Sequence, residues 1–306
     1  MTSLKALLPL AVLLLMSVAP TETKVVRSMK DCNEFFLEKT PPHIPRILEG
    51  GNIWGQNRFK TICQTFEDTR TFVTLYDTKN KIPVFSAAKY RGDHEGKRPK
   101  PSPWMIEPQL DDTKSNINMA PENNQETYEN QAVKKDYENN QSFDKGHLFP
   151  SSYGYDQIEK NSTFTLTNIV PQIGKFNQGT WNKMEQCIKC VMDKYCINNN
   201  NKTEGYVVIG ARPSNDNNTL KKRINIPSML WSAFCCYNSK DKKWLASAHW
   251  GKNIKPKDKC LPTKTLHDLH KELGKNTEVF PKTECPLKTT VTNVYKNLNS
   301  NCNCPK

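Results

Sequence analysis

Among the six histidines of the sequence, His147 has the neighbours that best suit it for chemistry. It closes the run Asp-Lys-Gly-His at residues 144–147 and is followed by Leu-Phe-Pro, so a glycine and a proline restrict the nearby backbone. A carboxylate, Asp144, lies three residues before it. With a reference pKa near ~6.5, an imidazole is substantially neutral at physiological pH and can take a proton from water. The pattern makes His147 a candidate general base.

A second polar group begins 30 residues after His147. Asn177 opens the run Asn-Gln-Gly-Thr-Trp, and Glu185 follows eight residues later. At 3.6 residues per turn, eight residues make two turns plus about 80°, so both side chains can face one edge of a metal ion. Alternatively, Asn177 is only a helix N-cap and Glu185 part of a solvated face. Taken singly, each residue favours that simpler interpretation.

Two elements must position these groups. Residues 177–196 carry apolar side chains at three- and four-residue steps, which predicts a helix with one buried face. Residues 162–170 alternate like a strand. Asn168 and Gln172 lie at the end of that strand, where they are expected to orient the site. The order is therefore a histidine segment, a strand and a helix.

This order resembles the ββα-metal finger of the secreted DNA/RNA non-specific endonucleases, whose bacterial members carry Asp-Arg-Gly-His and Asn-Gln-Gly-x-Trp with a downstream Glu. Further similarity lies in Cys-Asn-Glu-Phe-Phe at residues 32–36, Trp-Met-Ile-Glu-Pro-Gln-Leu at 104–110 and Asp-Tyr at 136–137. With these runs, nearly the whole mature chain is similar to the vertebrate endonuclease domain-containing 1 type of the family. The resemblance implies an α+β fold: a mixed, largely antiparallel sheet core with flanking helices and a ββα-metal finger.

The resemblance also assigns roles at the site. Hydrolysis of a phosphodiester needs an activated water, a counter-charge for the developing phosphate and help for the departing oxygen. His147 would be the base, and Asn177 would hold one Mg²⁺ ion, with Mn²⁺ as a possible substitute. Glu185 would accept hydrogen bonds from the waters of the ion. The implied catalytic residues are His147, Arg98, Glu185 and Asn168, and the implied substrate-binding residues are Asp144, Lys145 and Gln172.

Two positions in this assignment are open. Arg98 lies where the family places a phosphate-binding arginine, and a guanidinium fork suits phosphate oxygens, but Arg91 and the lysines beside Arg98 compete with it. Lys145 stands where the bacterial motif has arginine, and the two are not interchangeable at a bidentate contact. If Lys145 covers the finger or meets phosphate as a point charge, activity survives.

The composition agrees with a polyanionic substrate. The 306 residues include 44 Lys and Arg against 31 Asp and Glu, a net charge of +13, which indicates phosphate-rich polymers or anionic surfaces as partners. A collagenous or repeat protein is excluded. We expect DNA and RNA as partners, whereas the oligomeric state stays open.

The first residues predict export. Lys5, an apolar run over residues 6–16 and small residues up to Ala19 have the layout of a secretory signal peptide, cut between about residues 19 and 23. No second apolar stretch is long enough to span a membrane. We therefore expect a signal peptide over residues 1–22 and one secreted, extracellular domain over 23–306, with a Cys-rich C-terminal tail. Four N-x-[ST] sequons, at Asn140, Asn161, Asn201 and Asn217, agree with this compartment.

The 11 cysteines all follow the predicted signal. Cys187, Cys190 and Cys196 could form half of a zinc site, but thiols of an exported chain usually oxidise. At most five disulfides can form, and one thiol is left over. The spacing does not give the pairing.

The remaining pattern is of short elements. Strands are predicted over residues 58–66, 71–76, 82–90, 206–209, 224–237 and 244–250, and a short helix over 266–273. Residues 110–141 are polar and predict a long loop with short helices at most, which is either a functional surface or poorly ordered.

The sequence supports one main function and two alternatives. The main hypothesis is a secreted, Mg²⁺-dependent, sugar-non-specific endonuclease. The first alternative is a catalytically silent nuclease fold that binds polyanions or a cell-surface partner. The second is a zinc-stabilised or disulfide-rich effector without enzymatic activity.

Overall fold

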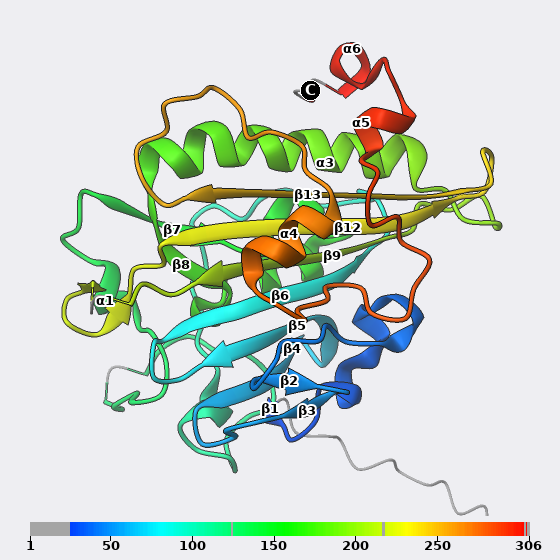
Figure 1. Ribbon diagram of the computed structural model, residues 1–306. Coiled ribbons are helices and arrows are strands. Elements are labelled where there is room, and N and C mark those ends of the chain that lie inside the picture. The colour runs from blue at the N-terminus through cyan, green and yellow to red at the C-terminus, as the bar shows by residue number, and fades with distance from the viewer. Residues whose placement is uncertain (1–24, 124, 216–217, 303, 305–306) are drawn as a thin grey trace, which may run out of the picture.

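The computed structural model describes residues 25–123, 125–215, 218–302 and 304. Its centre is a seven-stranded sheet in the order β1-β4-β5-β6-β9-β12-β13, and every pairing in it is antiparallel (Figure 1). The strands are β1 (Val25–Val26), β4 (Phe59–Phe66), β5 (Thr69–Asp77), β6 (Ile82–Tyr90), β9 (Gly205–Arg212), β12 (Met229–Asn238) and β13 (Lys243–Lys252). Small two-stranded pairs are β2 (Leu48–Glu49) with β3 (Asn52–Ile53), β7 (Phe143–His147) with β8 (Ile169–Ile173), and β10 (Thr219–Leu220) with β11 (Ile224–Asn225).

Helices cover both faces of this sheet. The α-helices are α1 (Lys134–Tyr137), α2 (Gln157–Ser162), α3 (Asn182–Tyr195), α4 (Leu266–Leu273), α5 (Val291–Val294) and α6 (Leu298–Cys302). Short 3₁₀ segments are η1 (Met29–Phe35), η2 (Leu37–Lys39), η3 (Pro108–Leu110), η4 (Ser151–Tyr153) and η5 (Leu166–Asn168), and η6 (Phe176–Trp181) is a π turn. The predicted α+β class with a largely antiparallel core is confirmed.

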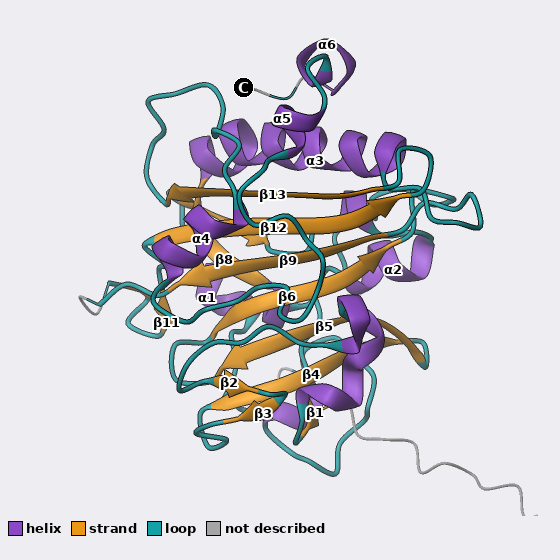
Figure 2. Ribbon diagram, turned by 45° about the vertical axis from the view of Figure 1, so that its right-hand side comes forward, coloured by secondary structure: helices purple, strands orange, loops and turns teal. Residues whose placement is uncertain are grey.

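The two faces of the sheet bury separate cores because side chains alternate along each strand. In β12, Phe234 packs into one core with Trp181 and Ile188 of the α3 region. Its neighbour Ala233 packs into the other core with Leu269 of α4 and the N-terminal segment. Figure 2 shows α3 running along β12 and β13, and α4 lying on the opposite side. Each large side chain buried in this way contributes roughly 1.5–3 kcal/mol.

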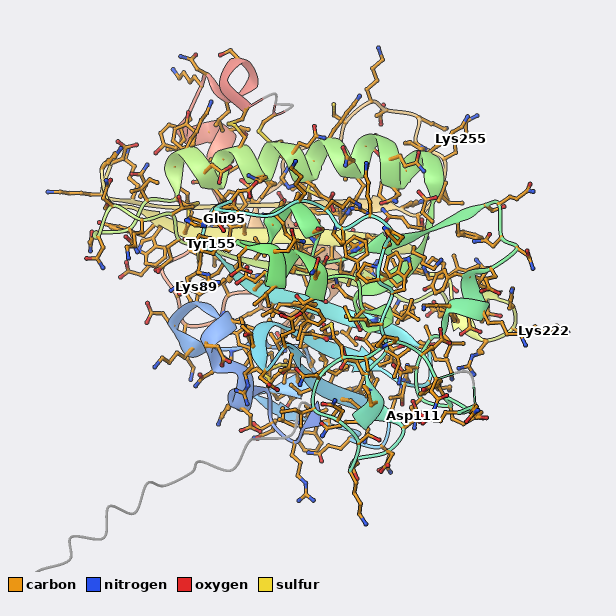
Figure 3. The ribbon with its side chains drawn as sticks, turned by 180° about the vertical axis from the view of Figure 1, so that it is seen from behind. Lys89, Glu95, Asp111, Tyr155, Lys222 and Lys255 are labelled. Carbon is orange, nitrogen blue, oxygen red and sulfur yellow. A yellow bond between two sulfur atoms is a disulfide. The ribbon has the colours of Figure 1, made fainter. Side chains whose placement is uncertain are left out.

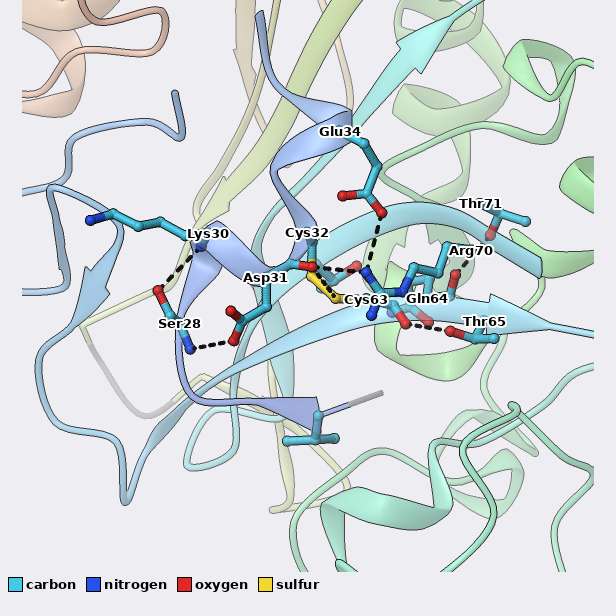
Figure 4. Close-up of a disulfide and its surroundings, with 12 residues drawn as sticks. Ser28, Lys30, Asp31, Cys32, Glu34, Cys63, Gln64, Thr65, Arg70 and Thr71 are labelled. Carbon is cyan, nitrogen blue, oxygen red and sulfur yellow. Dashed lines mark hydrogen bonds and ion pairs between the residues drawn. A yellow bond between two sulfur atoms is a disulfide. The ribbon is translucent and has the colours of Figure 1, made fainter. Parts of the chain in front are cut away.

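Five disulfides join these layers, as the count of cysteines allows. They are Cys32–Cys63, Cys187–Cys304, Cys190–Cys302, Cys196–Cys236 and Cys235–Cys285, and Cys260 is a free thiol. The candidate zinc cysteines are therefore all oxidised. Figure 4 shows the bond that ties η1 to β4, beside Arg70, which donates to the carbonyl of Asp31. Alternation explains the adjacent pair: Cys235 and Cys236 point to opposite faces of β12 and bond to opposite layers.

Most predicted elements are confirmed, and one is wrong. Strand 224–237 is split into β11 and β12, because Pro227 between them cannot donate to a ladder. The strand predicted over residues 162–170 is instead the end of α2, a turn, η5 and the start of β8. Its alternating threonines hold a buried hydrogen-bond network, in which the hydroxyl groups of Thr165 and Thr167 both donate to Glu107. The polar and apolar residues alternate there because the threonines supply this network, and not because the segment is a pleated strand.

The polar segment over residues 110–141 is a loop with the single short helix α1 among its described residues. It is fixed by Arg223, whose guanidinium donates to the carbonyls of Tyr128 and Gln131 and pairs with Asp136 at 3.1 Å. Among the described helices, none is long and apolar enough to cross a membrane. The predicted signal peptide lies outside the described residues.

Candidate active site

The predicted finger is present: β7 pairs antiparallel with β8, and η6 and α3 follow directly. The register sets His147 opposite Ile169 and Asp144 opposite Gln172. Alternation along β7 directs Lys145 and His147 to one face and Asp144 to the other. Lys145 and His147 therefore face the cleft, whereas Asp144 faces the η6 turn before α3.

Gly146 is required by this packing. A Cβ atom at this position would lie 2.1 Å from Oε1 of Gln172, which covers the strand there. Gln172 is fully buried, and no described residue bonds to its amide. The side chain of Gln172 therefore packs under β7.

His147 is held in an aromatic pocket. Its ring meets Phe164 edge-on with centroids 4.8 Å apart, and Trp104 lies at 5.4 Å. Only 8% of the residue is exposed, and Nε2 has no hydrogen-bond partner among the described residues. Burial, together with the positive charge of Arg98, lowers the pKa of His147 to about 3. The imidazole is therefore neutral at physiological pH.

Asn177 lies inside the π turn η6 and is not a helix N-cap. Its Nδ2 donates to Oδ2 of Asp144 at 2.9 Å, and Nε2 of Gln178 donates to the same oxygen at 2.9 Å. Because a carboxylate only accepts hydrogen bonds, this contact fixes which end of the Asn177 amide faces Asp144. No described residue donates to Oδ1 of Asn177, so this oxygen could serve as a metal ligand.

Glu185 lies in the first turn of α3, and its carbonyl accepts from the hydroxyl of Tyr153 at 3.0 Å. Burial raises the pKa of its carboxyl to about 8, although the Trp181 indole and the positive charge of Arg98 act to lower that pKa. The π turn between Asn177 and Glu185 rotates less per residue than an α-helix. The side chains of Asn177 and Glu185 therefore lie on more nearly the same face of the helix than they would in a regular α-helix.

These groups meet in one cleft of about 450 Å³. Five predicted site residues line it: Arg98, Lys145, His147, Asn177 and Glu185. Three do not line it: Asp144, Asn168 and Gln172. The structure thus brings together the candidate base, the candidate metal ligands and two cations, and it sets the other three behind them.

Asn168 is buried behind the site and its amide is fully used. Its Oδ1 accepts from Oγ of Ser86 at 2.9 Å and from the amide of Phe149 at 3.1 Å. Its Nδ2 donates to the carbonyls of Phe149 and Thr163 at 2.9 and 3.0 Å. The side chain therefore fastens the backbone that follows His147.

Arg98 is placed by a loop fastened to α2. Gln157 accepts from the amide of Lys97 at 2.9 Å and donates to the carbonyl of Lys97 at 3.0 Å. Gly96 has a φ of +89° and lies too close to the backbone of Gln157 for a side chain. The Arg98 guanidinium lies 4.9 Å from the ring centroid of Phe164, whereas Arg91 pairs with Glu159 outside the cleft lining. Arg98 is thus the better placed of the two arginines.

A family model for DNA/RNA non-specific endonucleases matches residues 54–306. The chain belongs to the DNA/RNA non-specific endonuclease family. It is 29% identical over 220 residues to the endonuclease domain-containing 1 protein of Homo sapiens and 30% identical over 213 residues to that of Mus musculus. Each match covers 67% of this chain and 39% or 38% of the relative, so the chain spans about two fifths of their length.

The fold agrees with this family. A chain in the crystal structure of the EndoG/EndoGI complex superposes with a TM-score of 0.51 at 15% identity, over 74% of this chain and 90% of that chain.

The DNA/RNA non-specific endonucleases are metal-dependent His-Me finger nucleases. No described cluster of three or more His, Cys, Asp and Glu side chains could hold a metal. One amide oxygen with a nearby carboxylate is a different donor set, and it suits an ion such as Mg²⁺ that keeps most of its waters.

Sequence reasoning missed several residues that line the cleft of this endonuclease family member, among them Lys160. Lys160 of α2 is 4% exposed, and its ammonium pairs with Asp93 at 2.8 Å and donates to the carbonyl of Glu95. Figure 3 shows Glu95 beside Tyr155, whose carbonyl accepts from the amide of Glu95. Lys160 lies in a segment that the periodicity did not identify as a helix, so no local signal pointed to it.

Proposed function

We propose that the protein is a secreted, metal-dependent endonuclease that hydrolyses phosphodiester bonds of DNA and RNA with little sequence preference. The observation that carries the proposal is the convergence of His147, Asn177, Glu185 and Arg98 on one cleft. A base, a neutral oxygen ligand, a carboxylate and a cation are the groups that phosphodiester hydrolysis needs. A silent binding module would need none of the first three.

In this mechanism His147, which lines the cleft, removes a proton from the attacking water. A neutral imidazole carries a lone pair on one of its two ring nitrogens, so the ring can accept that proton. Burial and Arg98 make the free imidazole a weak base. A bound phosphodiester brings negative charge beside both groups, which opposes these causes and raises the basicity of the ring.

The metal, which we propose is Mg²⁺ with Mn²⁺ as a substitute, would be held by Oδ1 of Asn177. When bound, it would supply positive charge to the developing phosphate and to the leaving oxygen. Glu185 would accept hydrogen bonds from waters of the ion. Asp144 accepts from the amide nitrogen of Asn177, which would leave the amide oxygen to hold the ion.

The cations of the cleft would bind the phosphate oxygens, Arg98 as a planar fork and Lys145 as a point charge. Behind them, Asn168 and Gln172 hold the backbone of β7 and of the turn after it. We therefore propose that these two residues, and Asp144, position the groups that touch the substrate.

Secretion and glycosylation belong to the same proposal. Five disulfides in the described residues are typical of an oxidising compartment. The sequons and the predicted signal peptide support the same route.

The test is a nuclease assay of the purified protein on double-stranded DNA, single-stranded DNA and RNA, with Mg²⁺ and with EDTA. We expect cleavage of all three polymers that EDTA abolishes. His147→Ala should lower plasmid nicking by orders of magnitude while circular dichroism shows a retained fold. Nicking at the wild-type rate by His147→Ala would refute the assigned base, and cleavage unaffected by EDTA would remove the metal from the mechanism. Tight DNA binding without cleavage would favour the silent module.

A further inference from the structure

A lysine-rich loop follows β13 at one end of the sheet. Lys252, Lys255, Lys257 and Lys259 are all exposed, with Asp258 as the only acidic residue among residues 252–259. None of the four lysines forms an ion pair with a described residue. We call residues 252–259 the basic loop. Its charge is available to a partner.

The start of the basic loop is fastened to the finger. Asn253 is buried, and its Oδ1 accepts from the amide of Ile173 at 2.9 Å. Its Nδ2 donates to the carbonyls of Pro171 and Pro227 at 2.8 and 3.1 Å. Pro171 and Ile173 belong to β8, so the loop is held by the strand that pairs with the His147 strand.

The rest of the loop lies beside the turn that carries Asn177. Residues 254–258 and 260–262 line a hollow of about 290 Å³ together with Phe176 and Thr180, which belong to the same η6 turn as Asn177. Figure 3 shows Lys255 projecting above the end of α3 at which η6 enters the helix. The lysines are therefore next to the candidate active site but are absent from the lining of its cleft.

We propose that the basic loop is a second binding surface, which holds the phosphate backbone of a nucleic acid strand after that strand leaves the cleft. This inference rests on the proposed function. Lysine ammonium groups act as point charges and read no base, so the surface fits a sequence-independent enzyme. Each phosphate contact should add about 0.9 to the slope of log affinity against log salt. The basic loop should therefore increase the affinity for long substrates and leave the rate of the chemical step unchanged.

The chain offers a matched control. Lys240, Lys242 and Lys243 form an equally exposed lysine cluster at the other end of β13. The ten residues of β13 put the two clusters roughly 30 Å apart, at about 3.3 Å per residue. Replacing either set with glutamine removes the same charge.

The experiment compares the triple variant Lys255→Gln, Lys257→Gln, Lys259→Gln with the triple variant Lys240→Gln, Lys242→Gln, Lys243→Gln. Cleavage of long duplex DNA is measured between 50 and 200 mM salt. We expect the loop variant to raise KM by roughly tenfold, to keep kcat within about twofold and to lower the salt slope by roughly 2–3. The control variant should match the wild type. Equal effects of both variants would show a response to net charge alone and overturn the proposal.

Binding without cleavage separates this inference from the proposed function. In EDTA, affinity for a duplex is measured for the same proteins, so the loop is tested even if the wild type proves inactive. The free thiol of Cys260, next to the loop, gives a second readout, since a bound duplex should slow its labelling by a maleimide at least threefold. An unchanged labelling rate, or an unchanged affinity of the loop variant, would refute the surface.

Discussion

Lys145 lies in the wall of the cleft with its ammonium near two aromatic rings. Its Nζ is 5.5 Å from the centroid of Trp104 and 5.7 Å from that of Tyr137. Burial lowers its pKa. A cation held over aromatic faces in this way presents a single charge to the cleft and makes no fork contact with another side chain.

We predict that Lys145→Arg changes kcat/KM by less than about threefold, because the aromatic faces also accept a guanidinium. Lys145→Met keeps the aliphatic stem but removes the charge, and should lower kcat/KM by roughly 10–100-fold, the worth of one charged hydrogen bond. Steady-state cleavage of a defined duplex measures both. A large gain with Lys145→Arg would instead show that the family's fork contact is missing here.

If Glu185 takes part in metal binding as proposed, that binding should depend on pH. Its carboxyl has a pKa of about 8 in the metal-free protein, so below pH 8 an ion must displace a proton. Affinity for Mn²⁺, followed by electron paramagnetic resonance, should therefore rise about tenfold per pH unit up to pH 8 and then level off. His147, with a pKa of about 3, does not titrate in this range.

Glu185→Gln is the control, since an amide does not titrate there. It should bind Mn²⁺ more weakly and with an affinity independent of pH in this window. A pH dependence that persists in Glu185→Gln would assign the proton to another group.

At the scale of elements, the sequence predicted every strand of the main sheet except the two-residue β1, and also the helix after η6, because those segments have a clear apolar period. It did not predict the π turn, since the extra residue in a turn leaves no local pattern. It also predicted a strand over residues 162–170, which was wrong, because the alternating threonines there form buried hydrogen bonds to Glu107 instead of lining one face of a strand. The motif located His147 and Asn177, while the roles of Asn168 and Gln172 depend on burial that no motif reports.

The η5 segment gives a prediction that separates positioning from chemistry. Asn168→Ala leaves buried backbone groups of Phe149 and Thr163 unsatisfied, whereas the Ser86 hydroxyl keeps its contact with Thr74, so the free energy of unfolding should fall by about 3–5 kcal/mol. Ser86→Ala removes one bond to Asn168 and one to Thr74, and should cost about 1–2 kcal/mol. Urea unfolding measures both. An Asn168→Ala protein with wild-type stability and no activity would show a direct catalytic role.

At the scale of the whole molecule, two disulfides close nearly the same loop. Cys187–Cys304 and Cys190–Cys302 have sequence separations of 117 and 112 residues and both join α3 to the C-terminal segment. The number of disulfides followed from the composition, but this pairing did not, because it joins cysteines that only the folded chain brings together.

Once one of these bonds is made, the other closes only a very small ring. Replacing either pair with alanine should therefore lower the free energy of unfolding only slightly. Replacing both pairs should lower it by about 4.7 kcal/mol, the loop-entropy contribution of a closed loop of roughly this length. Thermal unfolding of the two single-pair variants and the combined variant checks this. Additive losses would mean that each bond stabilises by local contacts instead.

The same pairing has a consequence for biosynthesis. Cys187 and Cys190 leave the ribosome more than a hundred residues before their partners, which at roughly 5–20 residues per second is on the order of 6–23 s. Throughout that interval the helix that carries Glu185 exposes two thiols one turn apart. They can oxidise with each other or with Cys196, so maturation of this protein should depend on an isomerase that reopens wrong disulfides of α3 until Cys302 and Cys304 have been synthesised.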